Sequence, residues 1–559
     1  MANVPIYQRL AEAFAFEGVD TFFTLMGDAN MHWSTSMRSI EGMSMFHVRH
    51  EHCACAMAMG YHSATGKVGV ASTTCGPGFT QIMTSLTTAV RSRVPLVVFA
   101  GEAPITAKWY VQEIDQAAFA TACGAHYIRV LDPTRLHQYV REAFYTARQE
   151  RRPVVIGVPY DMQKESAPDL GPYVTSDSLV PQITPITADP SQICELAAKL
   201  KSAQCPVILA GKGVIVADAR AEVEALAERS GALIATTLLA RGLYDDNPFC
   251  IGVSGGYARQ IAREIGEIAD LVIAIGASMT YYTVDGGRMF PSAQIVQIDV
   301  EPAGYKHGAK VADFYIKADA KQATNMLLEN LDDYGSGNQA KSGIRSAELA
   351  ARIKNEPADS SVYAIEPGVL DPREVIETLD TILPKDCDVI SGSGHQSYFH
   401  TIMRGWEAGK YHLMRDFGAI GNGLGYAMGV TAGRNNGRVL LFEGDGSLIM
   451  HIQELETIRR HNLKLLICIM NDGAYGSEIH KFRQEGLDDS SVIFGRPDFA
   501  AIARGFGLGG ETVTNLDQLS SLVDLYENDD RTHVWDIHIS DQVVSPRMRK
   551  TVTLGHGVL

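Results

Sequence analysis

Two short polar motifs follow buried apolar runs in the last third of the chain. Gly444-Asp445-Gly446-Ser447 comes directly after the apolar run 439–442, and Asn471-Asp472-Gly473 follows the run 465–470. Because parallel strands end at the same edge of a sheet, we expect the two loops to meet where open α/β sheets bind ligands. A carboxylate, an amide oxygen and a backbone carbonyl suit Mg²⁺, and the glycines would let the backbone approach a diphosphate.

This pair of motifs resembles the diphosphate and metal motif of thiamine-diphosphate (ThDP) enzymes, the family of acetolactate synthase, pyruvate decarboxylase and benzoylformate decarboxylase. In that family the second loop usually has two adjacent asparagines, of which the second ligates the metal, and Met470-Asn471 stands in their place here. The resemblance implies Mg²⁺ held by Asp445, the Asn471 side chain and the Gly473 carbonyl. It also implies cofactor contacts from both loops: Gly444, Asp445, Gly446, Ser447, Asn471, Gly473, Ala474 and Tyr475. Taken alone, both motifs could be ordinary turns.

The composition is that of a globular protein of several domains. A chain of 559 residues is too long for one core and suggests about three domains. The net charge of -16 argues against a nucleic-acid partner. No apolar run of about 18 residues and no signal-peptide pattern is present, so we expect a cytoplasmic protein without a membrane partner. Nine cysteines without CxxC pairs favour reduced thiols.

Apolar runs alternate with helix-length segments along the whole chain, which predicts an α/β protein with doubly wound parallel sheets. The expected strands are 21–26, 68–72, 95–100, 154–158, 207–210, 233–235, 271–275, 295–298, 389–390, 440–442, 465–470 and 535–539. Polar linkers at 171–190 and 332–367 separate three such units. They match the three ThDP-enzyme domains: a pyrimidine-binding domain at 1–172, a central domain at 190–331 and a diphosphate-binding domain at 366–545, followed by a tail at 546–559.

Arg49-His50-Glu51 precedes a helix of small residues and resembles the family's R-H-E motif. In the family this glutamate contacts the aminopyrimidine ring of ThDP and shares a proton with it. Burial would raise the pKa of Glu51 and keep that proton available near neutral pH. Glu51 is therefore the expected catalytic carboxyl and a cofactor contact. Without the other motifs, a helix-start carboxylate would be the better interpretation.

Two further stretches of the first domain resemble loops that face the cofactor. The turn 74–78 resembles the family's S-G-P-G turn, which makes Pro77 an expected contact, and Gln81 could face the pyrimidine. The segment 27–30 matches the G-D-x-N of pyruvate and indolepyruvate decarboxylases, whereas acetolactate synthases have P-G-G. In those decarboxylases this aspartate and a glutamate shortly after the metal loop handle protons, so the resemblance makes Asp28 and Glu478 a candidate acid–base pair. Their alternative roles are a helix N-cap and a solvated helix face.

One segment departs from the decarboxylase pattern. Where those decarboxylases carry two adjacent histidines, this chain has Gln112-Glu113-Ile114-Asp115, which resembles the F-Q-E-x-D of acetolactate synthases. The glutamine of that pattern reaches the active site, so Gln112 is a candidate catalytic residue. His32, near Asp28, could supply the missing imidazole, although a lone histidine after a loop is more often a packing residue.

Two loops of the third domain resemble the family's diphosphate loop and the turn whose large apolar residue holds the cofactor bent. They make Gly394, His395, Gly418 and Ile420 expected cofactor contacts. In the central domain Gly211-Lys212-Gly213 lacks the third glycine of a dinucleotide fingerprint. Gly276-Ala277-Ser278 lacks the arginine of the acetolactate synthase FAD segment, so FAD is an open but disfavoured second cofactor.

The resemblance implies a ThDP- and Mg²⁺-dependent enzyme that makes or breaks a carbon–carbon bond next to a carbonyl. Asp28 and Glu478 favour a non-oxidative 2-oxo acid decarboxylase with carboligase capacity. Gln112 favours an acetolactate-synthase-like carboligase, or a lyase acting on a 2-hydroxyacyl thioester or diketone. A catalytically silent ThDP-fold binding protein is disfavoured because Glu51, Asp445 and Asn471 are present. In the family the glutamate at the position of Glu51 faces the metal site of another subunit. We therefore expect at least a homodimer and favour a homotetramer.

Overall fold

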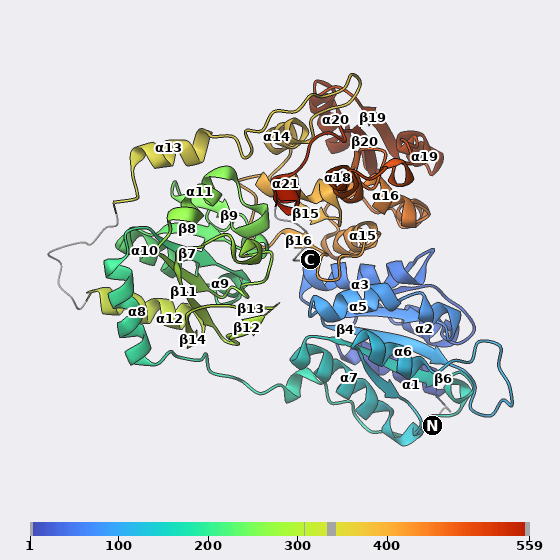
Figure 1. Ribbon diagram of the computed structural model, residues 1–559. Helices are drawn as coiled ribbons and strands as arrows, with labels where there is room; N and C mark the ends of the chain where they lie inside the picture. Colours follow the sequence, from blue (N-terminus) through green and yellow to red (C-terminus); the bar gives the residue numbers. More distant parts are fainter. Residues whose placement is uncertain (1–3, 307, 333–342, 554–559) are drawn as a thin grey trace.

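Three parallel β-sheets of six strands each organise the chain (Figure 1). The structure is a computed structural model and describes residues 4–306, 308–332 and 343–553. In each sheet the strand order runs outward from the first strands in one direction and then in the other, so the connecting helices cover both faces of the sheet (Figure 1). The predicted fold class, α/β with three doubly wound parallel sheets, is confirmed.

The N-terminal sheet has the strand order β2-β1-β3-β4-β6-β5. Its strands are β1 (Thr21–Thr24), β2 (Ser44–His47), β3 (Gly69–Thr73), β4 (Leu96–Glu102), β5 (His126–Arg129) and β6 (Pro153–Pro159). The helices of this unit are α1 (Ile6–Phe16), α2 (Met31–Arg38), α3 (Glu51–Thr65), α4 (Pro77–Thr80), α5 (Met83–Arg91), α6 (Gln116–Cys123) and α7 (Leu136–Glu150).

The central sheet has the order β14-β11-β10-β7-β8-β9. Its strands are β7 (Pro206–Ala210), β8 (Leu233–Thr236), β9 (Cys250–Val253), β10 (Leu271–Ile275), β11 (Gln294–Asp299) and β14 (Phe314–Lys317), and a separate hairpin joins β12 (Tyr305–Lys306) and β13 (Ala309–Lys310). The accompanying helices are α8 (Pro190–Ser202), α9 (Lys212–Val216), α10 (Arg220–Ser230), α11 (Gln260–Ile268) and α12 (Ala320–Asp332), and α13 (Ala347–Asn355) lies in the second predicted linker.

The C-terminal sheet has the order β16-β15-β17-β18-β20-β19. Its strands are β15 (Asp388–Ser391), β16 (Tyr411–Leu413), β17 (Val439–Gly444), β18 (Leu466–Asn471), β19 (Gly509–Val513) and β20 (His533–His538). Its helices are α14 (Pro372–Ile382), α15 (Gly423–Arg434), α16 (Asp445–Leu448), α17 (Glu454–Arg460), α18 (Gly476–Glu485), α19 (Phe499–Gly505), α20 (Gln518–Glu527) and α21 (Pro546–Thr553). The sheets lie within the three predicted domains, whose exact limits stay predictions, and residues 554–559 of the predicted tail lie outside the described residues.

The close packing of α3 against α15 joins the N-terminal and C-terminal units (Figure 1). Both helices consist largely of small residues, and one continuous hydrophobic core includes side chains of each. A Cβ added at Gly60 would lie 2.1 Å from the Tyr426 carbonyl oxygen, and one added at Gly429 would lie 2.0 Å from the Met57 carbonyl oxygen. The two backbones therefore approach so closely that only glycine fits at these positions.

Packing also accounts for the Gly211-Lys212-Gly213 motif of the central unit. A Cβ added at Gly211 would lie 2.1 Å from the Gly276 carbonyl oxygen, and one added at Gly213 would lie 2.6 Å from the Gly276 Cα. Two loops at the carboxyl edge of the central sheet thus touch through their backbones, and this contact explains the glycines without a bound nucleotide.

The state of the cysteines and the lengths of the apolar helices can be read from the structure. All nine cysteines are free thiols. Among the helices of the described residues, none combines the length and the apolar character needed to cross a membrane.

Replacing Gly429 by alanine tests the α3–α15 contact. The added methyl group would overlap the Met57 carbonyl, so we expect a loss of about 1–3 kcal/mol of stability and a lower melting temperature. Gly505→Ala is the matched control, because no atom lies within 4 Å of its Cβ position and the substitution should be neutral or stabilising. Equal melting temperatures for the two variants in a thermal unfolding experiment would contradict the packing argument.

Candidate active site

Asp445 stands where the loops after β17 and β18 meet. The two strands pair in parallel with Gly444 opposite Met470, so their loops leave the sheet at the same level. The Asp445 carboxyl is buried, its Oδ1 accepts a hydrogen bond from the Gly446 N–H (2.8 Å), and its Oδ2 accepts one from the Gly473 N–H (2.9 Å). These two bonds fix the orientation of the carboxyl group.

A second carboxyl, that of the half-buried Asp472, lies beside Asp445. Burial raises the pKa of Asp445 to about 7, although its backbone hydrogen bonds counteract part of the effect. Burial and the nearby charge of Asp445 raise the pKa of Asp472 well above its usual range. Two adjacent buried carboxyl groups cannot both ionise without a compensating positive charge. A hard divalent cation with oxygen ligands supplies such a charge, so the donor set fits Mg²⁺.

Side chains alone do not complete this site. In residues 4–306, 308–332 and 343–553, no group of three His, Cys, Asp or Glu side chains is arranged to hold a metal. A cation beside Asp445 and Asp472 would therefore also need backbone, solvent or ligand oxygens. Mg²⁺ commonly binds in this way, through one or two carboxylates and phosphate oxygens.

Asn471 and Gly473, the predicted partners of Asp445, already have other partners. The Asn471 side chain is fully buried, donates from Nδ2 to Asp536 (2.7 Å) and accepts from the Gly473 N–H (3.1 Å). The Gly473 carbonyl accepts hydrogen bonds from the N–H groups of Phe494 (3.0 Å) and Gly495 (2.9 Å). Asp472 and Ala474, the residues that follow each of them, line the cavity beside Asp445 instead, and the choice of metal ligands stays a prediction.

The physical reason for this placement is the length of β18. The apolar run stops at Met470, but the strand continues through Asn471. Asn471 is therefore still part of the strand, and its side chain lies on a face of the sheet, where it bonds to Asp536 of β20. The chain leaves the sheet only at Asp472.

A cavity of about 290 Å³ opens over these loops, with Tyr257 and Tyr282 of the central unit in its wall. Its lining contains ten of the residues predicted for cofactor binding in the C-terminal domain: Gly394, His395, Gly418, Ile420, Gly444, Asp445, Gly446, Ser447, Ala474 and Tyr475. Asp472 and Glu478 also line it, whereas Asn471 and Gly473 do not. None of the six residues predicted in the N-terminal domain lines this cavity: Asp28, His32, Glu51, Pro77, Gln81 and Gln112.

Hydrogen bonds hold the cavity loops in register. The Ser447 Oγ accepts from the Gly421 N–H (2.7 Å) and so ties the turn that carries Ile420 to the Gly444–Ser447 loop. His395 is buried, and its Nε2 accepts from the Ser545 N–H (3.1 Å). Burial and the neighbouring His480 lower the pKa of His395, so its ring is neutral at pH 7 and carries its proton on Nδ1.

Glu51 belongs to a second group of residues on the N-terminal unit. It begins α3 and is half-buried, and burial raises its pKa. A Cβ added at Gly78 would lie 3.1 Å from the Glu51 Oε1 and 2.7 Å from the Thr74 methyl carbon, so the glutamate lies against the turn that contains Pro77.

Asp28 and Gln112 lie around the same turn. Gly76 has φ of +60°, and a Cβ there would lie 2.3 Å from the Gln112 carbonyl oxygen, so this turn requires glycine. The Cys75 thiol donates to the Gln112 Oε1 (3.4 Å), and the charge of Asp28 contributes, after burial, to the raised pKa of Cys75. Together with Glu51, these residues form an N-terminal half-site, in which Asp28, Pro77 and Gln81 are exposed.

His32 and Glu478 are placed apart from that half-site. The His32 ring stacks between Tyr7 and Tyr160, with centroids 5.4 and 6.0 Å away, which is the packing role weighed against catalysis. Glu478 lies in the C-terminal cavity and forms an ion pair of 3.4 Å with Lys481. Within one chain the cavity brings Glu478 close to the loops of Asp445 but not to Asp28, so the roles of both remain predictions.

Several cavity residues carry no signal in the family motifs. Asp472, Tyr257, Tyr398, Arg415 and Lys481 all line the cavity. Asp472 could have been found by placing the strand end one residue later. Arg415 stands three residues before Gly418, but nothing in the sequence shows that its side chain enters the cavity.

Comparison with known proteins covers all three units. The thiamine pyrophosphate enzyme family models match as an N-terminal TPP binding domain at residues 6–119, a central domain at 193–327 and a C-terminal TPP binding domain at 392–537. The chain is 28% identical to the acetolactate synthase isozyme 2 large subunit of Escherichia coli K12, over 96% of this chain and 95% of that protein. It is 29% identical to an acetolactate synthase large subunit of Parasynechococcus marenigrum, over 91% and 83% of the two chains, respectively. A probable acetolactate synthase large subunit of Methanocaldococcus jannaschii is 27% identical over 92% of this chain and 88% of its own.

Paired substitutions distinguish the two ligand assignments. We expect Asp472→Ala to lower Mg²⁺ affinity by about 10–100-fold, because it removes one of the two carboxylates beside the cation. Asn471→Ala should leave Mg²⁺ affinity within a few-fold but lower stability by about 1–3 kcal/mol, because Asp536 loses a buried partner. Calorimetric titration with Mg²⁺ in the presence of ThDP, together with thermal unfolding, measures both effects. The reverse pattern would restore Asn471 as the ligand.

Proposed function

The chain belongs to the thiamine pyrophosphate enzyme family, and we propose that within this family it is a carboligase of the acetolactate-synthase type. The observation that carries the proposal is similarity to acetolactate synthase large subunits over more than nine-tenths of the chain. Gln112 supports it, because the segment 112–115 has the Q-E-x-D pattern of those enzymes and packs on the turn beside Glu51.

The residues of the C-terminal cavity fit the diphosphate end of the cofactor. Asp445, Asp472 and the Ala474 carbonyl would hold Mg²⁺, and the loops 393–396 and 444–447 would hold the phosphate groups. Bound ThDP supplies an electron sink for carbon–carbon bond cleavage and formation, and the protein supplies binding, orientation and proton transfer. The proximity of the cation would allow both carboxyl groups to ionise.

Glu51 is the proposed proton-holding group. Its half-buried carboxyl has a raised pKa, so a larger fraction of it keeps a proton near neutral pH than an exposed glutamate would. Asp28 and Gln112 lie around the same turn and would contact the reacting carbons. The small glycines of that turn leave Glu51 room beside Thr74.

A second copy of the chain is the proposed source of the missing half of the site. The cavity contains no N-terminal half-site residue, while Asp28, Pro77 and Gln81 are exposed. Exposed large apolar side chains flank both halves: Met26, Met31, Trp109 and Val111 on one, and Ile449, Met450, Tyr475 and Phe494 on the other. Such surfaces mark protein–protein contacts. We therefore propose a homodimer in which each half-site meets the cavity of the partner, and a homotetramer as a further assembly.

Non-oxidative decarboxylation of a 2-oxo acid is the second candidate. The Gly27-Asp28-Ala29-Asn30 loop favours it, because acetolactate synthases have P-G-G at this position. Asn30 holds this loop in place: its Oδ1 accepts from the Gly27 N–H (2.8 Å), and its Nδ2 donates to the Ser72 Oγ (2.9 Å).

Product analysis with pyruvate decides between the candidates. Protein loaded with ThDP and Mg²⁺ should release CO₂ and form a ligated 2-hydroxy-3-oxo acid, and Glu51→Gln should lower the rate by about 10²–10⁴-fold with ThDP still bound. Release of free aldehyde as the sole organic product would establish decarboxylation instead. No CO₂ and no ligated product from any 2-oxo acid would overturn both candidates and direct attention to diketones and 2-hydroxyacyl thioesters.

Complementation between two inactive variants tests the shared site. Co-expressed Glu51→Gln and Asp445→Asn chains should recover about one quarter of the wild-type sites, because half of the random dimers pair the two variants and each such dimer has one intact site. Each variant expressed alone is the control and should be inactive. Absence of recovered activity in purified heterodimers would place Glu51 and Asp445 of one chain in the same site.

A further inference from the structure

Arg415 is a charged side chain that lines the cavity without a polar partner. It lies in the loop between β16 and α15, three residues before Gly418. Its Nε and Nη2 atoms are buried from solvent. Among the described residues its side chain forms neither a hydrogen bond nor an ion pair. Buried guanidinium groups are ordinarily paired with carboxylates or carbonyls, because an unpaired buried charge is costly.

Aromatic rings and a second arginine form the surroundings of Arg415. Its guanidinium carbon lies 4.8 Å from the Tyr257 ring centre and 5.2 Å from that of Tyr398. These two rings stack on each other at 4.8 Å. Burial and the charge of Arg547 lower the pKa of Arg415 to about 9, and no carboxylate counteracts the effect. The group is therefore positively charged at neutral pH, and no carboxylate of residues 4–306, 308–332 and 343–553 compensates its charge.

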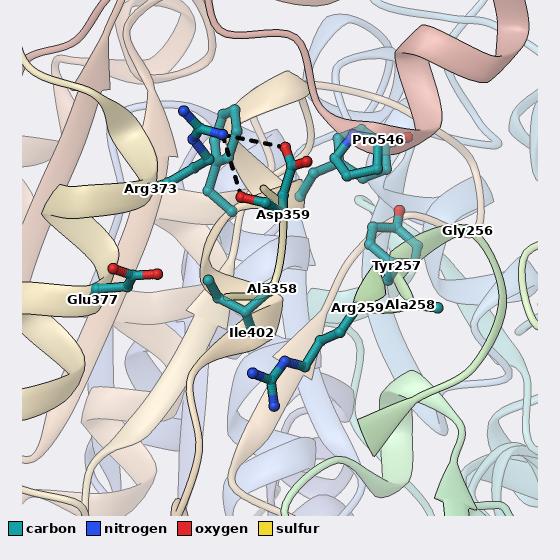
Figure 2. Close-up of a pocket in the computed structure, with 12 residues that line it drawn as sticks. Gly256, Tyr257, Ala258, Arg259, Ala358, Asp359, Arg373, Glu377, Ile402 and Pro546 are labelled. Atoms are coloured by element: carbon teal, nitrogen blue, oxygen red, sulfur yellow. Dashed lines mark hydrogen bonds and ion pairs between the residues drawn. The ribbon is translucent and has the colours of Figure 1, made fainter. Parts of the chain in front are cut away.

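The wall around Arg415 is assembled from the central unit and the end of the chain. Tyr257 and Tyr398 line both this cavity and a smaller one of about 40 Å³. Figure 2 shows the smaller cavity with Tyr257 in its wall. Arg547 lies in the first turn of α21, and its guanidinium carbon lies 4.4 Å from the centre of the Tyr282 ring. A second positive charge thus stands behind the aromatic rings that face the cavity.

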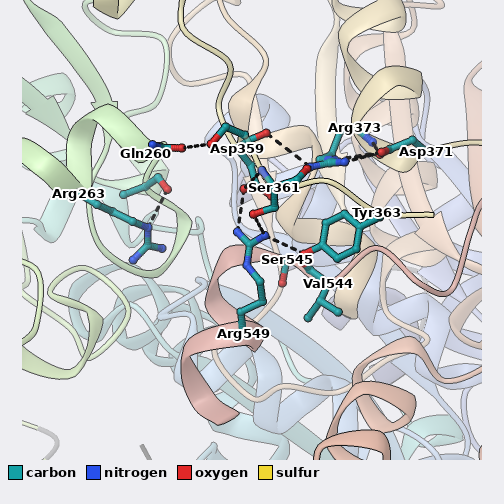
Figure 3. A network of polar contacts seen from close by, with 12 residues as sticks. Gln260, Arg263, Asp359, Ser361, Tyr363, Asp371, Arg373, Val544, Ser545 and Arg549 are labelled. Atoms are coloured by element: carbon teal, nitrogen blue, oxygen red, sulfur yellow. Dashed lines mark hydrogen bonds and ion pairs between the residues drawn. The ribbon is translucent and has the colours of Figure 1, made fainter. Parts of the chain in front are cut away.

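A polar network keeps α21 in this position. The Arg549 guanidinium donates to Asp359 (2.8 Å) and to the Tyr363 hydroxyl (2.8 Å), and Tyr363 in turn donates to the Val544 carbonyl (2.8 Å) (Figure 3). Asp359 also pairs with Arg373. The second linker therefore holds α21 in place through these bonds. The arginines and tyrosines around Arg415 are in this way fixed by the fold.

We propose that Arg415 recognises an oxyanion of the substrate, either a carboxylate or a phosphate ester, and is the residue that makes the enzyme specific for anionic carbonyl compounds. The inference deepens the proposed function, on which it rests, since it assigns the substrate class of the same cavity. The planar guanidinium offers two parallel N–H donors that match an oxyanion, and the low dielectric of the enclosed site strengthens the contact.

The cofactor diphosphate is the competing partner for Arg415. Its negative charge would already meet a cation at Asp445 and Asp472 and the backbone N–H groups of the glycine loops. Arg415 is therefore left for the substrate, and the experiment has to separate the two partners by measuring ThDP affinity and anion affinity independently.

Anion titration of the full chain loaded with ThDP and Mg²⁺ tests the proposal. The probes are malonate for a carboxylate and methyl phosphate for a phosphate ester, measured by calorimetry for the wild type, Arg415→Gln and Arg415→Lys. Arg91→Gln is the matched control, because Arg91 is exposed and rests on the nearby Phe417 ring but does not line the cavity. We expect Arg415→Gln to weaken binding of at least one probe by about tenfold or more, with ThDP affinity unchanged. Arg415→Lys should retain part of the binding, and Arg91→Gln all of it.

Thermal unfolding separates recognition from a structural role. Because Arg415 has no polar partner among the described residues to lose, Arg415→Gln without anions should melt no lower than the wild type. The wild type and Arg91→Gln should gain more stability from the better-bound probe than Arg415→Gln does. The proposal is overturned if neither probe binds the wild type, if Arg415→Gln binds both as the wild type does, or if it loses ThDP affinity instead. A wild type that takes up no ThDP refutes the proposed function, and the same titration of the cofactor-free chain then still decides the role of Arg415.

Discussion

The adjacent carboxyl groups of the buried Asp445 and the half-buried Asp472 impose the constraint on which the rest of the site depends. In water their repulsion would be weak, but in a buried site both the loss of solvation and the neighbouring charge favour the protonated forms. The fold nevertheless fixes Asp445 with two backbone N–H donors, which favour the ionised form. A carboxyl pair held in this way favours the binding of a cation. The glycine loops around it leave space for an anion bound to that cation.

The helix pair α3 and α15 explains why the two half-sites of one chain stay apart. Gly60 and Gly429 allow these helices to pack with their backbones in contact, and the Arg49 N–H donates to the Glu454 carboxylate (3.0 Å) just before α3 begins. Glu51, the first residue of α3, is thereby fixed relative to its own C-terminal unit. Moving it to the cavity of the same chain would break this core, so a partner chain is the less costly way to complete the site.

The sequence could predict the inner strands of all three sheets but none of the edge strands. Inner strands are buried on both faces and appear as continuous apolar runs, as in β10, β17 and β18. Edge strands are shorter or partly exposed: β2 has no fully buried residue, and β5 has only one. Their sequences carry neither an apolar run nor a clear alternation, so only the pairing with a neighbour identifies them as strands.

Within the site, motif spacing located the loops but not the directions of their side chains. One residue of extra strand length turns Asn471 into the core and gives its place to Asp472. No motif could reveal Arg415, because its surroundings come from a central loop and from the end of the chain. The same cavity thus contains a carboxyl pair and a guanidinium group. The fold does not pair these groups with each other. In the free protein the carboxyl pair favours its protonated forms and the guanidinium has no counter-charge among the described residues, and both conditions lower stability. They persist in a fold when ligands supply the counter-charges, and here a cation at the carboxyl pair and an anion at Arg415 would complete both.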